Sequence, residues 1–353
     1  MAKSPNLAVD IGGIRLKNPL ICGSGEHLIE PSGIEAAFNA GAAAVVMKST
    51  NESQAAKTQL ARAEYAMLDS DWRPLDWDGT PPRDAHLFCR SGLSPLTFDD
   101  WLKLLKNSNA LARHHNALVI ASLIPADPIN AVDYARSMEE AGARVIELNI
   151  GAPHAAEAAA GVLTLERDAV RVREMTKRIS DAISVPLWVK LTGQSDDVAG
   201  LVAAAREGGA DAVTIMGRFM AFVPDVASRA PVLGTFGAIG GAWALPLTCR
   251  WLALARRAVG PDYPLIATNG ARDGLDIVRF LLAGARSVQM TTAIMTGGFQ
   301  VLTEALRTVE TYLSDSDETI DSLIGQAADR LVDYAEIRTE RQRWRELFAT
   351  LGP

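Results

Sequence analysis

The stretch Pro264-Leu-Ile-Ala-Thr-Asn-Gly-Ala-Arg-Asp-Gly-Leu-Asp-Ile-Val-Arg-Phe-Leu-Leu-Ala-Gly-Ala-Arg-Ser-Val-Gln-Met-Thr-Thr-Ala-Ile294 predicts a strand, a helix and a second strand. The first apolar run ends at Asn269-Gly270, Asp273 can cap an amphipathic helix, and Ser287 begins the next apolar run. A second polar turn, Thr291-Thr292, follows that run. Because such turns present backbone N–H groups and hydroxyls at the carboxyl ends of parallel strands, we expect a phosphate site there.

A Gly-Ala step between a helix and an apolar strand recurs along the chain. Its four copies lie at 40–48, 141–149, 208–216 and 283–290. Glycine at this point fits a left-handed helix C-cap. Four further apolar strands lie between the copies, at 20–24, 118–123, 187–191 and 265–269. Eight continuous apolar strands with helices between them predict an α/β fold with a parallel sheet covered on its faces, which we expect to close into a (β/α)8 TIM barrel.

We expect the 353 residues to form one domain, with the barrel at about residues 19–313. Apolar residues alternate on both sides of Gly12-Gly13, which predicts an N-terminal β-hairpin. A polar insertion at 51–96 follows the second strand, so we expect it on the catalytic face as a lid or a dimer contact. Another long loop, 217–241, follows the sixth strand. The tail at 317–351 predicts one or two amphipathic helices packed outside the barrel.

Composition argues against several classes of partner. The net charge is −7 and no block of lysine and arginine stands out, which disfavours nucleic acid and anionic membranes. No apolar run reaches the length of a membrane span, and the N-terminus has no apolar signal region. The three cysteines are scattered, so neither a disulfide framework nor an iron–sulfur or other metal site is expected. We therefore expect a reduced, cytoplasmic protein without a metal.

Two lysines, Lys48 and Lys190, end predicted strands. A lysine at the end of a buried strand is costly unless it meets an anion or an electron-rich ligand. A salt bridge with a loop carboxylate would explain one such lysine. Two of them, in a barrel with a phosphate-type turn, favour a ligand site. Glu26 and His27 follow the first strand and can face the same site.

Seven segments match the sequence pattern of a known family and follow one another in the order typical of that family. They are Asn18-Pro-Leu-Ile21, Ala44-Val-Val-Met-Lys-Ser49, Phe88-Cys-Arg-Ser-Gly-Leu-Ser-Pro-Leu-Thr-Phe-Asp-Asp-Trp101, Glu147-Leu-Asn-Ile-Gly-Ala-Pro-His154, Pro186-Leu-Trp-Val-Lys-Leu-Thr192, Gly208-Gly-Ala-Asp-Ala-Val-Thr214 and the stretch 264–294. Together they resemble the dihydroorotate dehydrogenase family of FMN-dependent barrels, which includes the related domain of dihydropyrimidine dehydrogenase. The resemblance covers about residues 7–299.

The resemblance implies that FMN is the cofactor. The residues it implies at the flavin ring are Ser24, Gly25, Lys48, Ser49, Asn149 and Lys190, and those at the phosphate are Gly240, Gly241, Asn269, Gly270, Thr291 and Thr292. Lys190 would stabilise the reduced, anionic flavin, while Lys48 and Asn149 would also face the substrate. The family usually has glycine at positions 269 and 291, but asparagine and threonine can still donate hydrogen bonds there.

The departures from the family fall in the half of the site that binds substrate. Asparagines that grip the pyrimidine in the family are replaced here at Cys89, His154 and Gly217. Unpaired amide edges of a dihydroorotate would cost affinity, so a different substrate is expected. The expected substrate-binding residues are Cys89, as an apolar wall, His154, and Arg218, which can pair with a substrate carboxylate.

The base is the least determined residue of the expected site. The family's usual Ser-Cys is Gly151-Ala152 here, so the cysteine base of one class is absent. His154, Glu157 and Thr164 can move a proton on the following loop. His154 has the best-suited pKa, whereas Thr164 is nearest the expected position but also fits a helix cap. The expected catalytic residues are Lys48, Asn149, His154 and Thr164.

These patterns predict an FMN-dependent oxidoreductase acting on CH–CH groups. It would transfer a hydride between flavin N5 and a carbon of a C–C bond beside a carbonyl, with a soluble electron acceptor and a homodimeric assembly. Two alternatives stay open. One is a genuine dihydroorotate dehydrogenase of pyrimidine biosynthesis with an altered pocket. The other is a flavin-free phosphate-binding aldolase or isomerase in which Lys48 or Lys190 forms a Schiff base.

Overall fold

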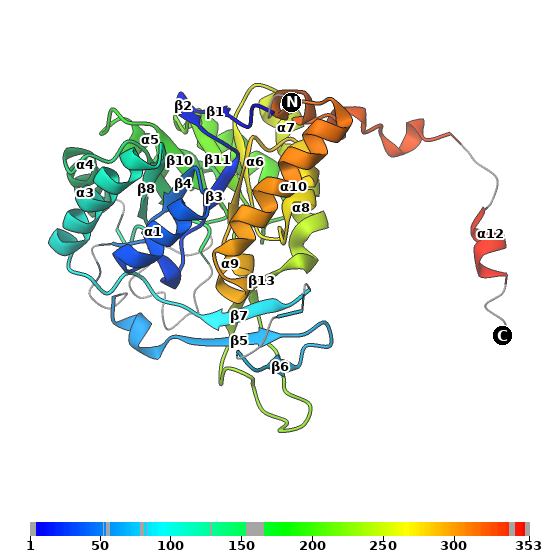
Figure 1. The fold of residues 1–353 in the computed structure, drawn as a ribbon, viewed down its shortest axis with the longest axis horizontal. Helices are drawn as coiled ribbons and strands as arrows, with labels where there is room; N and C mark the ends of the chain where they lie inside the picture. The colour runs from blue at the N-terminus through cyan, green and yellow to red at the C-terminus, as the bar shows by residue number, and fades with distance from the viewer. Residues whose placement is uncertain are drawn as a thin grey trace.

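Eight parallel strands close into a barrel in a computed structural model, which describes residues 5–51, 53, 57–77, 81–82, 84–127, 129–152, 166–338 and 343–349. The neighbours around the barrel are β10-β11-β14-β15-β3-β4-β8-β9 (Figure 1). The strands are β3 (Leu20–Cys22), β4 (Ala44–Val46), β8 (Leu118–Leu123), β9 (Ile146–Asn149), β10 (Leu187–Lys190), β11 (Ala212–Ile215), β14 (Leu265–Thr268) and β15 (Ser287–Met290). The predicted TIM barrel is confirmed.

All residues of these strands are buried, because side chains packed inside the barrel cover the inner face of the sheet and helices cover its outer face. The covering helices are α1 (Pro31–Asn39), α3 (Phe98–His114), α4 (Asn130–Glu140), α5 (Ala169–Ser180), α6 (Val198–Glu207), α7 (Leu245–Val259), α8 (Gly274–Leu282) and α10 (Gln300–Ser316). Asp273 caps α8 as predicted, since its carboxylate accepts from the backbone N–H groups of Leu275 and Asp276.

The recurring Gly-Ala step has the backbone conformation that the sequence predicts. Gly41, Gly142, Gly209 and Gly284 have φ angles of 99°, 93°, 95° and 113°. Each follows the last turn of a helix and directs the chain into the next strand. The repeat in the sequence is therefore a repeated helix end, used four times to return the chain to the barrel.

The N-terminal hairpin and the two long loops lie at opposite ends of the barrel (Figure 1). β1 (Val9–Ile11) and β2 (Ile14–Leu16) pair around Gly12-Gly13 and contact Asp211, which immediately precedes β11. The predicted hairpin is confirmed, and it covers the amino-terminal ends of the strands. The carboxyl-terminal ends are left to the loops.

The insertion and the loop after β11 form one antiparallel sheet, which the sequence analysis treats as two separate loops. Its order is β12-β13-β7-β5-β6, made of β12 (Phe219–Ala221), β13 (Gly237–Gly241), β7 (His86–Arg90), β5 (Glu64–Leu68) and β6 (Pro74–Leu75). Tyr65 and Cys89 are register partners and share one face. Phe88, on the other face, packs with Val223 and Ile239 in a small second core. The sheet therefore has one face toward the barrel mouth and one in its own core.

The tail follows the prediction only in its first half. α11 (Ile320–Leu323) buries its apolar residues, and Arg256 Nε holds Asp329 Oδ1 at 2.7 Å. Beyond that pair the chain leaves the barrel, and α12 (Arg343–Phe348) buries none of its residues (Figure 1). The expectation that the whole tail packs on the barrel is wrong there, because no groove of the described chain covers its apolar side chains.

The Gly142 helix end gives a test of the repeat. A Cβ at this position would meet only Asn109 Nδ2, at 3.8 Å, so the cost of Gly142→Ala is backbone strain rather than collision. We expect Gly142→Ala to lower the free energy of unfolding by at least about 1 kcal/mol, and Gly142→Asn to lower it less, because asparagine adopts positive φ more readily. Urea unfolding of the three proteins measures both differences, and equal stability of all three would contradict the account.

Candidate active site

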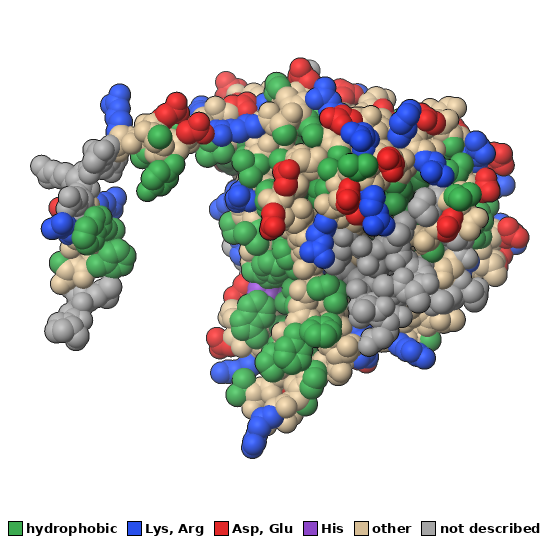
Figure 2. Space-filling model, turned by 180° about the vertical axis from the view of Figure 1, so that it is seen from behind, with side chains coloured by type: hydrophobic (Ala, Val, Ile, Leu, Met, Phe, Trp, Pro, Cys, Tyr) green, Lys and Arg blue, Asp and Glu red, His purple; other side chains and the backbone are tan. Residues whose placement is uncertain are grey.

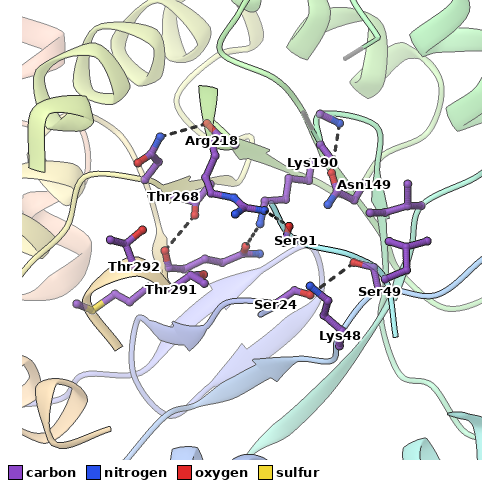
Figure 3. Close-up of a pocket in the computed structure, with 18 of the residues that line it drawn as sticks. Ser24, Lys48, Ser49, Ser91, Asn149, Lys190, Arg218, Thr268, Thr291 and Thr292 are labelled. Carbon is purple, nitrogen blue, oxygen red and sulfur yellow. Dashed lines mark hydrogen bonds between the residues drawn. The ribbon is translucent and has the colours of Figure 1, made fainter. Parts of the chain in front are cut away.

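A pocket opens at the carboxyl ends of the barrel strands, beneath the antiparallel sheet (Figure 3). It brings together ten residues that the sequence predicts for the site: Ser24, Lys48, Ser49, Asn149, Lys190, Arg218, Asn269, Gly270, Thr291 and Thr292. Gly25, Gly240 and Gly241 adjoin these residues, and Cys89 contacts Arg218. His154, Glu157 and Thr164 lie outside the described residues. Residues far apart in the chain thus meet in one pocket.

The end of the pocket expected to hold phosphate is built around Asn269. Its Oδ1 accepts from the backbone N–H of Gly241 at 3.2 Å, and its Nδ2 donates to the carbonyl of Gly217 at 3.2 Å. Asn269 has a φ of 68°, a conformation that asparagine tolerates. The side chain therefore ties two loops together at a position where the family usually has glycine.

Gly240 is closely packed against polar groups at the same end. A Cβ on Gly240 would lie 2.7 Å from Thr292 Oγ1 and 3.3 Å from Asn269 Oδ1. Any side chain there would therefore displace Thr292 and crowd Asn269. A cradle of glycine backbone, a threonine hydroxyl and an asparagine amide fits a phosphate group.

Lys190 lies on a buried polar network. Lys190 Nζ donates to Gln289 Oε1 at 2.8 Å and is 3.9 Å from Glu147 Oε1. Gln289 Nε2 in turn donates to Glu147. Burial lowers the pKa of Lys190, and the Glu147 carboxylate opposes this shift. The network holds a cationic side chain at the pocket, where it can face an electron-rich ligand.

Lys48 pairs with the carboxylate of Glu26. Lys48 Nζ donates to Glu26 Oε1 at 2.7 Å, and the two side chains are 8% and 19% exposed. Burial alone would raise the pKa of Glu26, but the adjacent Lys48 lowers it to about 2. The loop carboxylate that could explain a strand-end lysine is thus present for Lys48, although the lysine still lines the pocket.

Neutral hydroxyls and an amide lie between the two lysines. Ser49 Oγ is 2.8 Å from Ser122 Oγ and 3.5 Å from Ser24 Oγ. Asn149 Oδ1 accepts from the backbone N–H of Gly151 at 3.2 Å. Figure 3 shows Ser49 and Asn149 on the side of the pocket opposite Thr291 and Thr292. They present hydrogen-bonding groups of both kinds to a planar ligand.

Arg218 reaches the antiparallel sheet from the far side of the pocket. Its Nη1 donates to Cys89 Sγ and its Nη2 donates to Ser91 Oγ at 2.9 Å. Burial raises the pKa of the Cys89 thiol although Arg218 opposes this shift. Cys89 is therefore a hydrogen-bond acceptor, and the expectation of a purely apolar wall is wrong.

Three residues of the site were not foreseen: Ser91, Gln289 and Glu147. Ser91 lies two residues after Cys89, so strand alternation places both on one face. Gln289 and Glu147 are polar residues with long side chains inside fully buried strands. A residue of this kind in a fully buried strand is the signal that could have found the last two.

Comparison with known proteins identifies the family. The sequence profile described as "Dihydroorotate dehydrogenase" matches residues 83–313. The chain belongs to the dihydroorotate dehydrogenase family. It is 28% identical over 327 residues to the "Dihydroorotate dehydrogenase B (NAD(+)), catalytic subunit" of Thermoplasma acidophilum, covering 91% of this chain and 99% of the relative.

Two further relatives are similar. The protein of the same name from Methanothermobacter thermautotrophicus is 33% identical over 214 residues, 60% of this chain and 69% of the relative. The "Putative dihydroorotate dehydrogenase A (fumarate)" of Aeropyrum pernix is 28% identical over 333 residues, 93% of this chain and 99% of the relative. The chain is thus an oxidoreductase of a family that acts on CH–CH groups and typically binds FMN.

No helix in the described part of the chain is long and apolar enough to cross a membrane. Over the same residues, no three His, Cys, Asp or Glu side chains are grouped so that they could hold a metal ion.

The Glu26–Lys48 pair predicts a pH dependence of stability. The folded state lowers the pKa of Glu26 from 4.5 to about 2, so the pair stabilises the fold above pH 4.5. Protonation removes that contribution as the pH falls through the folded-state pKa. We expect the stability advantage of wild type over Glu26→Gln to be constant near neutral pH and to shrink below about pH 4.5. Urea unfolding at several pH values measures it, and an advantage that does not change with pH would contradict the assignment.

Proposed function

We propose that the protein is an FMN-dependent oxidoreductase that moves a hydride between flavin N5 and a carbon of a C–C bond beside a carbonyl, with a substrate other than dihydroorotate. The observation that carries the proposal is the contrast between the two halves of the pocket. The cradle of Gly240, Asn269 and Thr292 suits the phosphate of FMN. The opposite half has Cys89 and Gly217 at positions where the resemblance to the family implies amides.

Some residues of this chain would bind the flavin ring, and Lys190 would stabilise its charge. FMN, when bound, supplies the two-electron chemistry at N5. Ser24, Gly25, Ser49 and Asn149 would hold its ring by hydrogen bonds. Lys190, oriented by Gln289, would offer a fixed positive charge to the pyrimidine end of the ring, where the reduced flavin is anionic.

The companion proton needs a group of its own. We keep His154 and Thr164 as the proposed proton carriers, although both lie outside the described residues. Lys48 is a poor candidate for this step, since its ammonium donates to the ionised Glu26. Asn149 and Lys48 would instead orient the substrate against the ring.

Both alternative functions are less well supported. A Schiff-base aldolase needs an unprotonated lysine that is free to attack a carbonyl, whereas Lys48 Nζ is held in an ion pair and Lys190 Nζ is bound to Gln289. A genuine dihydroorotate dehydrogenase is favoured by the relatives' names. It is disfavoured by Cys89 and Gly217, because the amide edges of dihydroorotate would lose partners there.

The Gly240 cradle tests the cofactor. We expect purified wild type to be yellow with about one FMN per chain, and Gly240→Ala to bind FMN at least about tenfold more weakly, because the added Cβ would collide with Thr292 Oγ1. Absorbance and equilibrium dialysis measure both. Gly142→Ala, outside the pocket, is the matched glycine control and should keep its flavin. A colourless wild type that takes up no added FMN would overturn the proposal.

Assembly and location complete the proposal. We propose a single-domain cytoplasmic chain that forms a homodimer and passes electrons to a soluble acceptor. Exposed apolar residues at the antiparallel sheet support a contact between copies: Trp72, Trp77, Phe222, Val226 and Phe236. Figure 2 shows apolar side chains gathered on this part of the surface. Such a patch is typical of an interaction site.

The dimer proposal predicts a variant that separates the copies. Phe222 and Val226 line one groove with Trp72, and their side chains are 53% and 91% exposed. We expect Phe222→Asp with Val226→Asp to shift the chain from dimer to monomer in sedimentation velocity, since a charge at the centre of an apolar contact is costly. Phe348→Asp, on the exposed tail, should leave the dimer intact. A dimer lost only in Phe348→Asp would place the contact on the tail instead.

A further inference from the structure

Three charged side chains meet in the substrate half of the pocket: Glu26, Lys48 and Arg218. Glu26 lies at contact distance from Lys48, 2.7 Å, and its charge also reaches Arg218. The Arg218 guanidinium donates to two neutral groups, Cys89 Sγ and Ser91 Oγ. Among the described side chains, no carboxylate lies within 4.0 Å of Arg218.

The charges of this cluster do not balance. Lys48 and Arg218 carry one positive charge each, and the ionised Glu26 carries one negative charge, which leaves a net charge of +1. The second carboxylate of the site, Glu147, lies with Lys190 and Gln289 in a separate network. Partly buried charge is costly unless a ligand supplies the opposite charge.

Arg218 is the member of the cluster best arranged to meet such a ligand. It lines the pocket, and Figure 3 shows its side chain extending into the space shared with Lys190 and Ser91. Cys89 and Ser91 fix the plane of the guanidinium from the antiparallel sheet while leaving its charge uncompensated. A planar guanidinium with free N–H groups matches a carboxylate in two-point contact.

We propose that the substrate carries one carboxylate, that Arg218 binds it, and that Glu26 is a positioning residue that occupies Lys48 and so assigns anion recognition to Arg218. The inference rests on the proposed function for there being a substrate in this half of the pocket. It extends the expectation that Arg218 can pair with a substrate carboxylate, because Lys48 already has Glu26 as its partner. The antiparallel sheet then selects the substrate, because it supplies both groups that orient Arg218.

The test compares carboxylates with neutral ligands of the same shape. Isothermal titration calorimetry would use three pairs as probes: orotate and orotamide, nicotinate and nicotinamide, benzoate and benzamide. We expect wild type to bind at least one carboxylate about tenfold or more tightly than its neutral partner. Arg218→Gln should lose this preference, and Arg218→Lys, which keeps the charge but not the two-point geometry, should retain part of it.

The Glu26→Gln variant distinguishes a positioning role of Glu26 from a merely structural one. Removing its charge raises the net charge of the cluster from +1 to +2 and frees Lys48. We therefore expect the carboxylates to bind about tenfold more tightly to Glu26→Gln than to wild type, with the neutral partners unchanged. Charge removal at the two sites thus acts in opposite directions.

Several outcomes would overturn the inference. They are failure of all three carboxylates to bind wild type, an unchanged preference in Arg218→Gln, or weaker carboxylate binding in Glu26→Gln with the fold intact by circular dichroism. Flavin content, read from the absorbance of each sample, separates this result from the proposed function. A colourless protein that binds the carboxylates as expected would refute the flavin and keep the anion site. A yellow protein that does not bind the carboxylates as expected would keep the flavin and refute the anion site.

Discussion

The ammonium of Lys190 lies at the mouth of the barrel on a buried pair formed by Gln289 and Glu147, and the arrangement of the site depends on this network. β9, β10 and β11 pair in parallel, with Lys190 in register with Asn149 and Thr214. The strands thus end in polar side chains on neighbouring positions. A cation held this way by Gln289, at 2.8 Å, cannot move away without breaking buried hydrogen bonds. The barrel therefore presents a preorganised positive charge to its ligand.

Different residues around Lys190 would bind the cofactor and the substrate. Asn269 and Thr292, which follow barrel strands, make the cradle together with Gly240, which lies in β13 of the antiparallel sheet. The chain around β7 orients Arg218 through Cys89 and Ser91. Because Cys89 and Ser91 lie outside the barrel strands, they can vary without disturbing those strands.

Much of the barrel could be predicted from the sequence, because its signals are local. A Gly-Ala step predicts a helix end at Gly41 or Gly284 from a few residues, and an apolar run predicts a buried strand. The antiparallel sheet was missed because its strands β7 and β13 join residues such as Cys89 and Ala238, which are far apart in the chain. The same limit applies to the site: Lys48 and Arg218 were predicted from their positions, but their partners depend on long-range packing. In the tail, the amphipathic pattern predicts a helix with an apolar face, but it does not show which surface covers that face.

The central claim is that the pocket keeps the cofactor half of the family's site and has a changed substrate half. The most direct test is anaerobic reduction of the flavin, monitored by its absorbance. The account predicts that dithionite bleaches the bound FMN at once, while dihydroorotate at saturating concentration leaves it oxidised. Rapid bleaching by dihydroorotate would contradict the account, because the pocket with Cys89 and Gly217 would then accept the pyrimidine after all.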